Sequence, residues 1–184
     1  NAVRPGCFVS SNDVVMKYVA SLGTYPCLAL VLALLFLVAK LTGRIVTLDR
    51  FLNAQGVVIG SLFISITSVS VVPWMCEGNN PDGSSSLVAE RVIACWDTSE
   101  HVSLLVMGMF ATLIFVVGFM SLTIWATLAY PHKVTQPGGM RFVQRFQFLF
   151  GQYAADRYYF VVCIAFRKLL ICVVPVMLVN YPQV

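Results

Sequence analysis

The stretch that decides the fold is residues 54–75, AQGVVIGSLFISITSVSVVPWM, which contains no charged side chain. A helix of about 20 mostly apolar residues is long enough to cross the roughly 30 Å hydrocarbon core of a bilayer. The whole chain shares this character, because 59% of its 184 residues are hydrophobic and 11% are charged, and its mean hydropathy is +0.84. Soluble domains carry about 25% charged residues, and disordered chains need low hydrophobicity and high charge. Both classes are therefore excluded.

Three more segments meet the same requirement: residues 25–41, 101–130 and 158–178. An amphipathic lead-in over residues 13–22 extends the first of them on one side. We expect Pro26 at the start of the first helix, where proline is tolerated, and Pro131 at the end of the third. The sequence thus predicts an all-α, polytopic helical membrane protein, with about four transmembrane helices in a single module over residues 1–184.

The two ends of the sequence favour a piece of a longer chain. It begins at Asn1 without Met, and no charged region precedes an apolar run with a small-residue cleavage site. It ends at Val184 without a polar tail. We expect further residues to belong to the parent chain.

The charged residues predict an orientation, because short cytoplasmic loops of membrane proteins are enriched in Lys and Arg. Two connections are basic, one with Lys40, Arg44 and Arg50 and the other with Lys133, Arg141 and Arg145. The outer loop, residues 76–100, has one basic residue, Arg91, against Glu77, Asp82, Glu90, Asp97 and Glu100. We expect both basic loops on the cytoplasmic side of a plasma membrane, or on the stromal or matrix side of a thylakoid or mitochondrial inner membrane. The net charge of +4 is spread without a basic stripe, so nucleic acid is excluded as a partner.

Cys76 and Cys95 bracket the turn-rich outer loop at the mouths of two adjacent predicted helices. This position predicts a disulfide between them, worth about 3 kcal/mol through its effect on the unfolded chain. The alternative is a pair of free thiols in a reducing compartment. The cysteines and histidines do not have zinc spacing, so no metal site is predicted.

Residues 140–152 connect the third and fourth predicted spans. Their apolar side chains follow a helical spacing with polar residues between them, at positions 142, 143, 146, 149 and 150. This pattern predicts an amphipathic helix that lies in the membrane interface. The alternative is a loop helix that packs on another subunit.

Small residues mark one face of the second span. Gly56 and Gly60 are four apart, and Ser61 and Ser65 follow. Small residues at this spacing let membrane helices approach closely, so we expect this face to pack against another helix. The alternative is a polar pathway lined by hydroxyl groups.

Arg167 and Lys168 are the unusual residues of the fourth span, because each charge costs at least about 2.5 kcal/mol at the centre of a membrane helix. Adjacent helix residues point about 100° apart, so the two cannot face one seam. Three interpretations stay open: a carboxylate from missing chain or another subunit, a lipid head group or pigment, or side chains that reach to an interface. We expect the partner of these cations to come from another molecule.

His101 and His132 each stand at a predicted membrane boundary. Either could ligate a metal or a bound pigment, although an isolated histidine is more commonly an interfacial residue. The sequence holds no Ser/His/Asp grouping, paired carboxylates, HExxH or glycine-rich phosphate loop, so we do not expect an enzyme.

Several motifs carry a resemblance: the acidic loop closed by Cys95-Trp96, the run 146–150 (FQFLF), and the segments 156–160 (DRYYF) and 166–170 (FRKLL). Together they resemble the multi-spanning C-terminal region of large protist surface proteins, including those of alveolates, sometimes described as transient-receptor-potential-like. The resemblance implies further spans on both sides and a channel-like architecture. The family often has Trp-Glu before the arginine, whereas this chain has Phe160-Val161.

These patterns predict a non-catalytic membrane protein that packs as an accessory or structural component of a larger assembly, such as a photosynthetic or respiratory supercomplex of a protist. The alternative, which the resemblance implies, is a transient-receptor-potential-like ion channel or mechanosensory module. The expected partners are membrane lipids and other membrane subunits, with no soluble substrate. Structural lipids are the expected bound groups, and pigments stay an open option.

Overall fold

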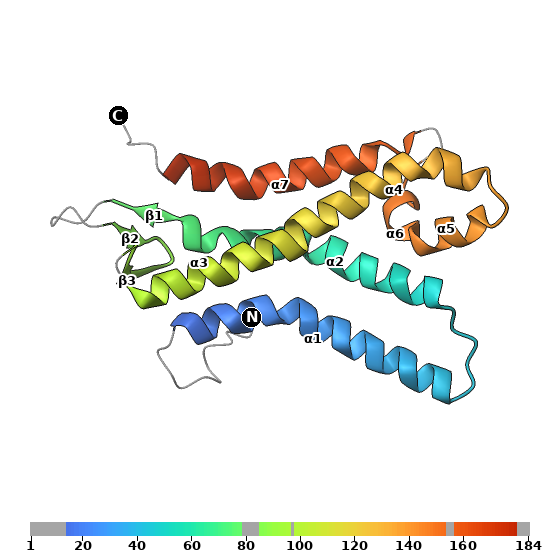
Figure 1. The fold of residues 1–184 in the computed structure, drawn as a ribbon, viewed down its shortest axis with the longest axis horizontal. Helices are drawn as coiled ribbons and strands as arrows, with labels where there is room; N and C mark the ends of the chain where they lie inside the picture. Colours follow the sequence, from blue (N-terminus) through green and yellow to red (C-terminus); the bar gives the residue numbers. More distant parts are fainter. Residues whose placement is uncertain (1–13, 79–84, 97, 154–156, 180–184) are drawn as a thin grey trace.

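The computed structural model describes residues 14–78, 85–96, 98–153 and 157–179 (Figure 1). Four helical segments are long and apolar enough to cross a membrane. They are α1 (Val14–Leu41), α2 (Leu48–Val71, continued by the 3-10 turn η2, Val72–Trp74), the third span, and α7 (Phe160–Val179). The third span consists of α3 (Ser99–Ala111), the π-helical segment η3 (Thr112–Val117) and α4 (Gly118–Val134). The predicted all-α polytopic fold is therefore confirmed.

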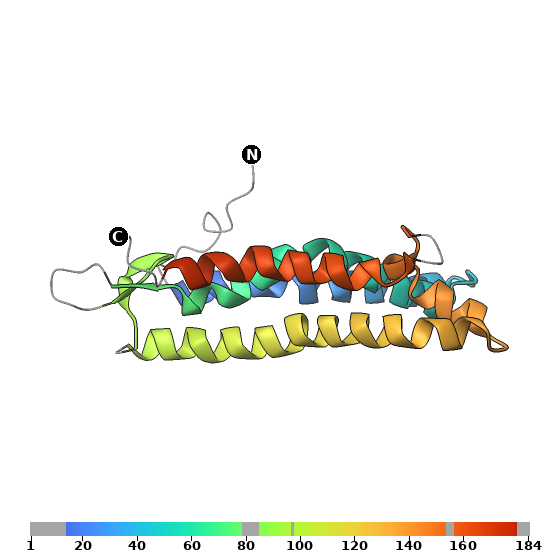
Figure 2. The same ribbon diagram turned by 90° about the horizontal axis from the view of Figure 1, so that it is seen from above.

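The helices form two layers. Figure 2 shows α1, α2 and α7 in one layer and the third span lying along the other. The main core fills the space between α2, α4 and α7, where Phe63 packs on Phe119 with ring centroids 5.0 Å apart. Cys172 of α7 is buried and accepts a hydrogen bond from the Ser68 hydroxyl of α2, so the same core continues along the α2–α7 contact.

The two ends of the bundle differ in chemistry (Figure 1). We call one the basic end, made of residues 42–47, α5 (Gly139–Arg145) and α6 (Gln147–Phe150). The other is the disulfide end, where β1 (Cys76–Glu77), β2 (Ser86–Leu87) and β3 (Glu90–Ala94) form an antiparallel sheet in the order β1-β2-β3. Both predicted basic loops thus lie at one end of the bundle and the described part of the outer loop lies at the other. Asp82, Asp97 and Asp156, used in the sequence analysis, lie outside the described residues.

Both predictions about proline are wrong. Pro26 lies inside α1, which is continuous from Val14, and Pro131 lies inside α4, which continues to Val134. In membrane helices, neighbouring groups and local adjustments satisfy the backbone groups that a proline frees, so proline does not end them as it does in water. The second span also begins earlier than expected, at Leu48 rather than Ala54.

The single helix predicted over residues 140–152 is instead two short helices. The backbone leaves the helical conformation at Phe146, with φ −105° and ψ 21°, and this residue ends α5 before α6 begins. The bend lets Phe146, Leu149 and Phe150 enter the main core. The apolar side of this segment therefore packs on its own chain.

Candidate functional site

Two polar contacts fasten the basic end to the start of α2. Arg145 of α5 forms an ion pair with Asp49, with 2.7 Å between Nη2 and Oδ1. Asn53 uses its side-chain oxygen to accept a hydrogen bond of 2.7 Å from the backbone N–H of Phe148. This N–H lies in the first turn of α6, where helices lack internal acceptors, and no side chain of α6 itself caps it. Asn53 therefore acts as a cap supplied by another helix.

Gly56 explains how α6 comes so close to α2. It is buried, and a Cβ at this position would overlap the ring of Phe148. The predicted close packing at Gly56 is thus present, but its partner is the aromatic ring of α6 rather than another transmembrane helix. At Gly60 the nearest atom to such a Cβ is Cζ of Phe119 in α4, at 3.9 Å, an ordinary contact.

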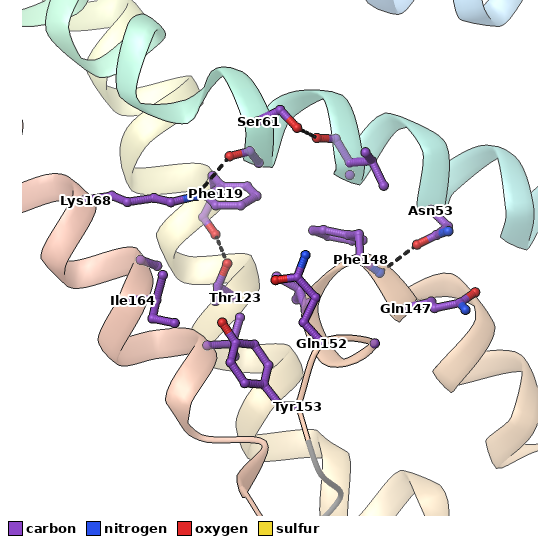
Figure 3. A pocket seen from close by; sticks show the side chains of 17 residues that line it. Asn53, Ser61, Phe119, Thr123, Gln147, Phe148, Gln152, Tyr153, Ile164 and Lys168 are labelled. Carbon is purple, nitrogen blue, oxygen red and sulfur yellow. Dashed lines mark hydrogen bonds between the residues drawn. The ribbon is translucent and has the colours of Figure 1, made fainter.

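Beside this contact lies a cavity of about 420 Å³ between α2, α4, α6 and α7, which we call the Lys168 cavity (Figure 3). Apolar side chains make up much of its wall, among them Val57, Phe119, Phe148, Ile164 and Ala165. Polar side chains also line it, namely Asn53, Ser61, Thr123, Gln147, Gln152, Tyr153 and Lys168. Figure 3 shows Gln152 in the middle, between Phe148 and Thr123. The volume falls within the range of about 300–1,000 Å³ that is typical of small-molecule sites.

Lys168 supplies the cation of this cavity. Its Nζ donates a hydrogen bond of 3.3 Å to the backbone carbonyl of Gly60, which joins α7 to α2. One N–H group of this ammonium thus has its partner within the chain, and a partner from another molecule stays a prediction for its other N–H groups and for Arg167. None of the described residues that line the cavity is a carboxylate. The described lining thus offers a cation to an anionic group.

Arg167, by contrast, points away from the cavity. Its side chain is exposed, and within the described residues no hydrogen bond or ion pair involves it. Leu170, Ile171 and Val174 follow at helical spacings of three, four and seven, and all three are exposed. We call these four residues the α7 outer face. The 100° angle between neighbours thus gives the two cations different surroundings.

Ser61 and Ser65 of the predicted small-residue face are both exposed on α2. The hydroxyl of Ser61 donates to the carbonyl of Val57 one turn earlier, at 2.8 Å. The buried hydroxyls of Thr67 and Ser70 likewise bond carbonyls of their own helix. Among the described residues no hydrogen bond joins Ser61 or Ser65 to another helix, and their packing against another helix stays a prediction.

The disulfide end is held by a separate network. The predicted disulfide is confirmed, since Cys76 is bonded to Cys95. Beneath it, His101 is completely buried, and its Nδ1 accepts a hydrogen bond of 3.2 Å from the backbone N–H of Trp96. The proton is therefore on Nε2, which donates to the carbonyl of Pro73 at 3.2 Å. Trp96 has a φ of +74°, and the bond to His101 helps to hold this uncommon conformation.

The two candidate histidines have different surroundings. Cys76, Cys95 and His101 bring their ligand atoms within 4.8 Å of one another, but the two sulfur atoms are bonded to each other and both nitrogens of His101 are engaged. His132 is exposed in the last turn of α4, where its Nε2 lies 2.9 Å from Nε2 of Gln136. Within the described part of the chain, Cys76, Cys95 and His101 form the only group of His, Cys, Asp or Glu side chains with metal-binding geometry.

Most residues that line the Lys168 cavity have no signal in the sequence that groups them. Asn53 of α2 meets Gln147, Gln152 and Tyr153, which lie in α6 and the turn after it, only in the fold. The available signal was the position of Asn53 and Gln55 at the start of an apolar span, where polar side chains usually find a specific partner. Gln55 does so, because its Nε2 donates to the carbonyl of Ala29 at 3.0 Å.

No protein-family profile, curated protein or solved structure matches this chain.

Proposed function

We propose that this chain is a non-catalytic integral membrane protein that packs as an accessory or structural component of a larger membrane assembly. The observation that carries the proposal is the α7 outer face, where exposed Arg167 sits among exposed apolar side chains without a partner in the described residues. A neighbouring subunit with an acidic side chain at the same depth fits this face. A photosynthetic or respiratory supercomplex of a protist would supply such a neighbour.

The cost of leaving Arg167 in lipid supports an acidic partner. Arg167 lies seven residues after the first residue of α7, which is about 10 Å along the helix axis. At the centre of a membrane helix an arginine costs at least about 2.5 kcal/mol on insertion scales. A carboxylate on a neighbouring helix removes much of this cost, whereas Leu170, Ile171 and Val174 supply the apolar contact around the pair.

The surface of α1 supports the same proposal. None of its most apolar window is buried inside the structure. It contacts the bundle through buried Tyr18, through the Ala29 carbonyl that accepts from Gln55, and through the aromatic pairs Phe36–Phe51 and Tyr25–Phe115. The exposed side of α1, which includes Leu34, Leu37 and Val38, is available to lipid and to neighbouring subunits.

We further propose a multi-pass topology with the basic end in the cytoplasm, or on the matching side of an organelle membrane. The Lys and Arg residues of both basic loops favour this side. The Cys76–Cys95 disulfide independently favours an oxidising compartment at the other end. Cysteine substitutions at Arg44 and Arg141 should be labelled from the same side by an impermeant thiol reagent. Labelling from opposite sides would contradict the topology.

Substitution of Arg167 tests the proposed assembly. Arg167→Leu should release the chain from its native assembly in mild detergent, while membrane insertion stays intact. Arg141→Leu is the matched control, because it makes the same chemical change at an exposed position of α5 outside the spans. Native gels and mass spectrometry of the co-purifying proteins give the readout. If Arg167→Leu leaves the assembly unchanged, the side chain reaches an interface instead and the proposal fails.

The competing function is a transient-receptor-potential-like channel or mechanosensory module of an alveolate-type protist surface protein. The observation that favours it is the exposed pair Ser61 and Ser65 on one side of α2. A symmetric homo-oligomer could place this side along a water path. Ion flux through liposomes that contain only the purified chain would support the channel, and flux should then fall when Ser65 is replaced by Leu.

A further inference from the structure

The ammonium group of Lys168 is only partly satisfied. It has three N–H donors, and one of them binds the Gly60 carbonyl. The other donors have no partner among the described residues, and the described lining of the Lys168 cavity holds no carboxylate. A lysine in a span without a counter-charge is costly, so an anion in this cavity would be strongly favoured.

The walls of the cavity indicate what kind of anion fits. Phe119, Phe148 and Ile164 line the same cavity as the ammonium group and present apolar surface to it (Figure 3). A fully hydrated ion would leave this surface in contact with water. An anion that carries a hydrocarbon chain covers it, and the apolar contact adds to the affinity.

The cavity also opens toward the lipid. Val57 and Ser61 line it and are at the same time exposed on α2. At the basic end, Gln147 and Gln152 are exposed lining residues as well. The cavity therefore has a polar opening toward the proposed membrane surface and a side opening between α2 and α7 toward the acyl chains.

We propose that the Lys168 cavity binds one anionic phospholipid. Its phosphate lies between Lys168 and the amide of Gln152, and an acyl chain leaves past Val57 and Ser61. The volume of about 420 Å³ holds a head group and the first part of the chains, so the remaining chain length lies along the outside of α2. Lys168 lies about 12 Å along the axis from the start of α7, so the lipid is drawn inward from the surrounding leaflet.

The neighbouring arginine supplies a matched control. Arg167→Gln and Lys168→Gln remove the same charge from adjacent positions, but Arg167 faces outward and Lys168 faces the cavity. A general attraction of anionic lipid to a positive helix would respond equally to both changes. A specific site formed by the Lys168 cavity would respond only to Lys168→Gln.

The experiment uses the whole purified chain in bilayers of phosphatidylcholine with a minor fraction of phosphatidylglycerol. After extraction in mild detergent, mass spectrometry counts the retained lipids per chain. The wild type should retain phosphatidylglycerol about tenfold above its share of the bilayer, because charge-assisted hydrogen bonds are the strong ones. Arg167→Gln should keep this enrichment, and Lys168→Gln should lose it. Equal loss in both variants, or no enrichment in the wild type, would overturn the proposal.

Lys168→Gln also removes the hydrogen bond to the Gly60 carbonyl, so a second variant and a competitor test lipid binding with this bond intact. Val57→Trp narrows the side opening at an exposed position and leaves Lys168 in place, so it should also abolish the enrichment; retention of the lipid would contradict the side opening. Inorganic phosphate at millimolar concentration should not displace the lipid, and displacement would identify a site for small anions instead. Association through Arg167 is read out separately, so either proposal can fail while the other stands.

Discussion

Gly56 is the position where one added methyl group should have a large effect. A Cβ there overlaps three atoms of the Phe148 ring, so the ring has to turn and α6 has to move off α2. The first change loses packing, and overpacking of this kind typically costs about 1–3 kcal/mol. The second breaks the Asn53–Phe148 hydrogen bond, which contributes about 1 kcal/mol. The gain in helix propensity from Gly to Ala, up to about 1 kcal/mol, offsets part of this.

We therefore expect Gly56→Ala to lower the free energy of unfolding by about 2 kcal/mol. For a chain of this size, that corresponds to a fall in Tm of about 4–8 °C. Thermal unfolding of the purified chain in detergent, followed by circular dichroism, measures the change. Gly60→Ala is the control, because its Cβ makes only an ordinary contact with Phe119 at 3.9 Å.

A double-mutant cycle with Phe148→Ala tests the cause. Without the ring, the clash is absent, and Gly56→Ala should be neutral or stabilising. The difference between the two backgrounds is the coupling energy, which we expect to be about 2–3 kcal/mol. An equal effect of Gly56→Ala in both backgrounds, or an effect no larger than that of Gly60→Ala, would refute the reasoning.

Three further changes test the two ends of the bundle. Cys76→Ser should lower the free energy of unfolding by about 3 kcal/mol, because the disulfide closes a loop between residues 19 apart. If reductant leaves the Tm of the wild-type chain unchanged, this expectation is wrong. His101→Ala leaves a backbone N–H and a buried carbonyl without partners, at about 1–3 kcal/mol each, and should speed proteolysis of the outer loop. His132 is exposed, so His132→Ala is the control and should leave the rate of proteolysis unchanged. Asp49→Asn should cost less than about 1 kcal/mol, because the Arg145 side chain is 46% exposed, and the difference should shrink in high salt.

The four spans could be predicted because the bilayer leaves a chain few choices. Length and hydropathy locate a membrane helix, since every backbone group in lipid must be satisfied within it. The errors arose at Pro26 and Pro131, where we applied the behaviour of helices in water. The start of the second span at Leu48 was missed for a related reason, because a helix continues past the apolar segment into the polar loop.

The elements missed at the disulfide end are too short to have a sequence pattern. β1 and β2 contain two residues each, which is less than one full alternation of inward and outward side chains. Their pairing depends on contacts that the disulfide and buried His101 hold in place. The disulfide itself could be predicted, because two cysteines at adjacent helix mouths need no further structure to meet.

The acceptor of Lys168 could not be predicted for a different reason. It is the backbone carbonyl of Gly60, and every residue has such a group. Only the packing of α7 along α2 selects this one. A sequence distinguishes residues only by their side chains, so it points to a carboxylate as the partner.

The π-helical segment of the third span determines how its two halves fit the bundle. Buried residues advance by three or four along an α-helix, as from Leu104 to Gly108 and Ala111, but the next buried residue is Val116, five positions on. The stripe then resumes its usual step at Phe119 and Thr123. The register of the buried stripe thus shifts by one residue between α3 and α4, and η3 is where the shift occurs. If η3 became a regular α-helix with all its residues kept, the core side of α4 would turn by about 100° toward the lipid, whereas deleting one residue from η3 would let a regular helix keep the buried stripe on one face. In this span, an irregular backbone is what allows one continuous core.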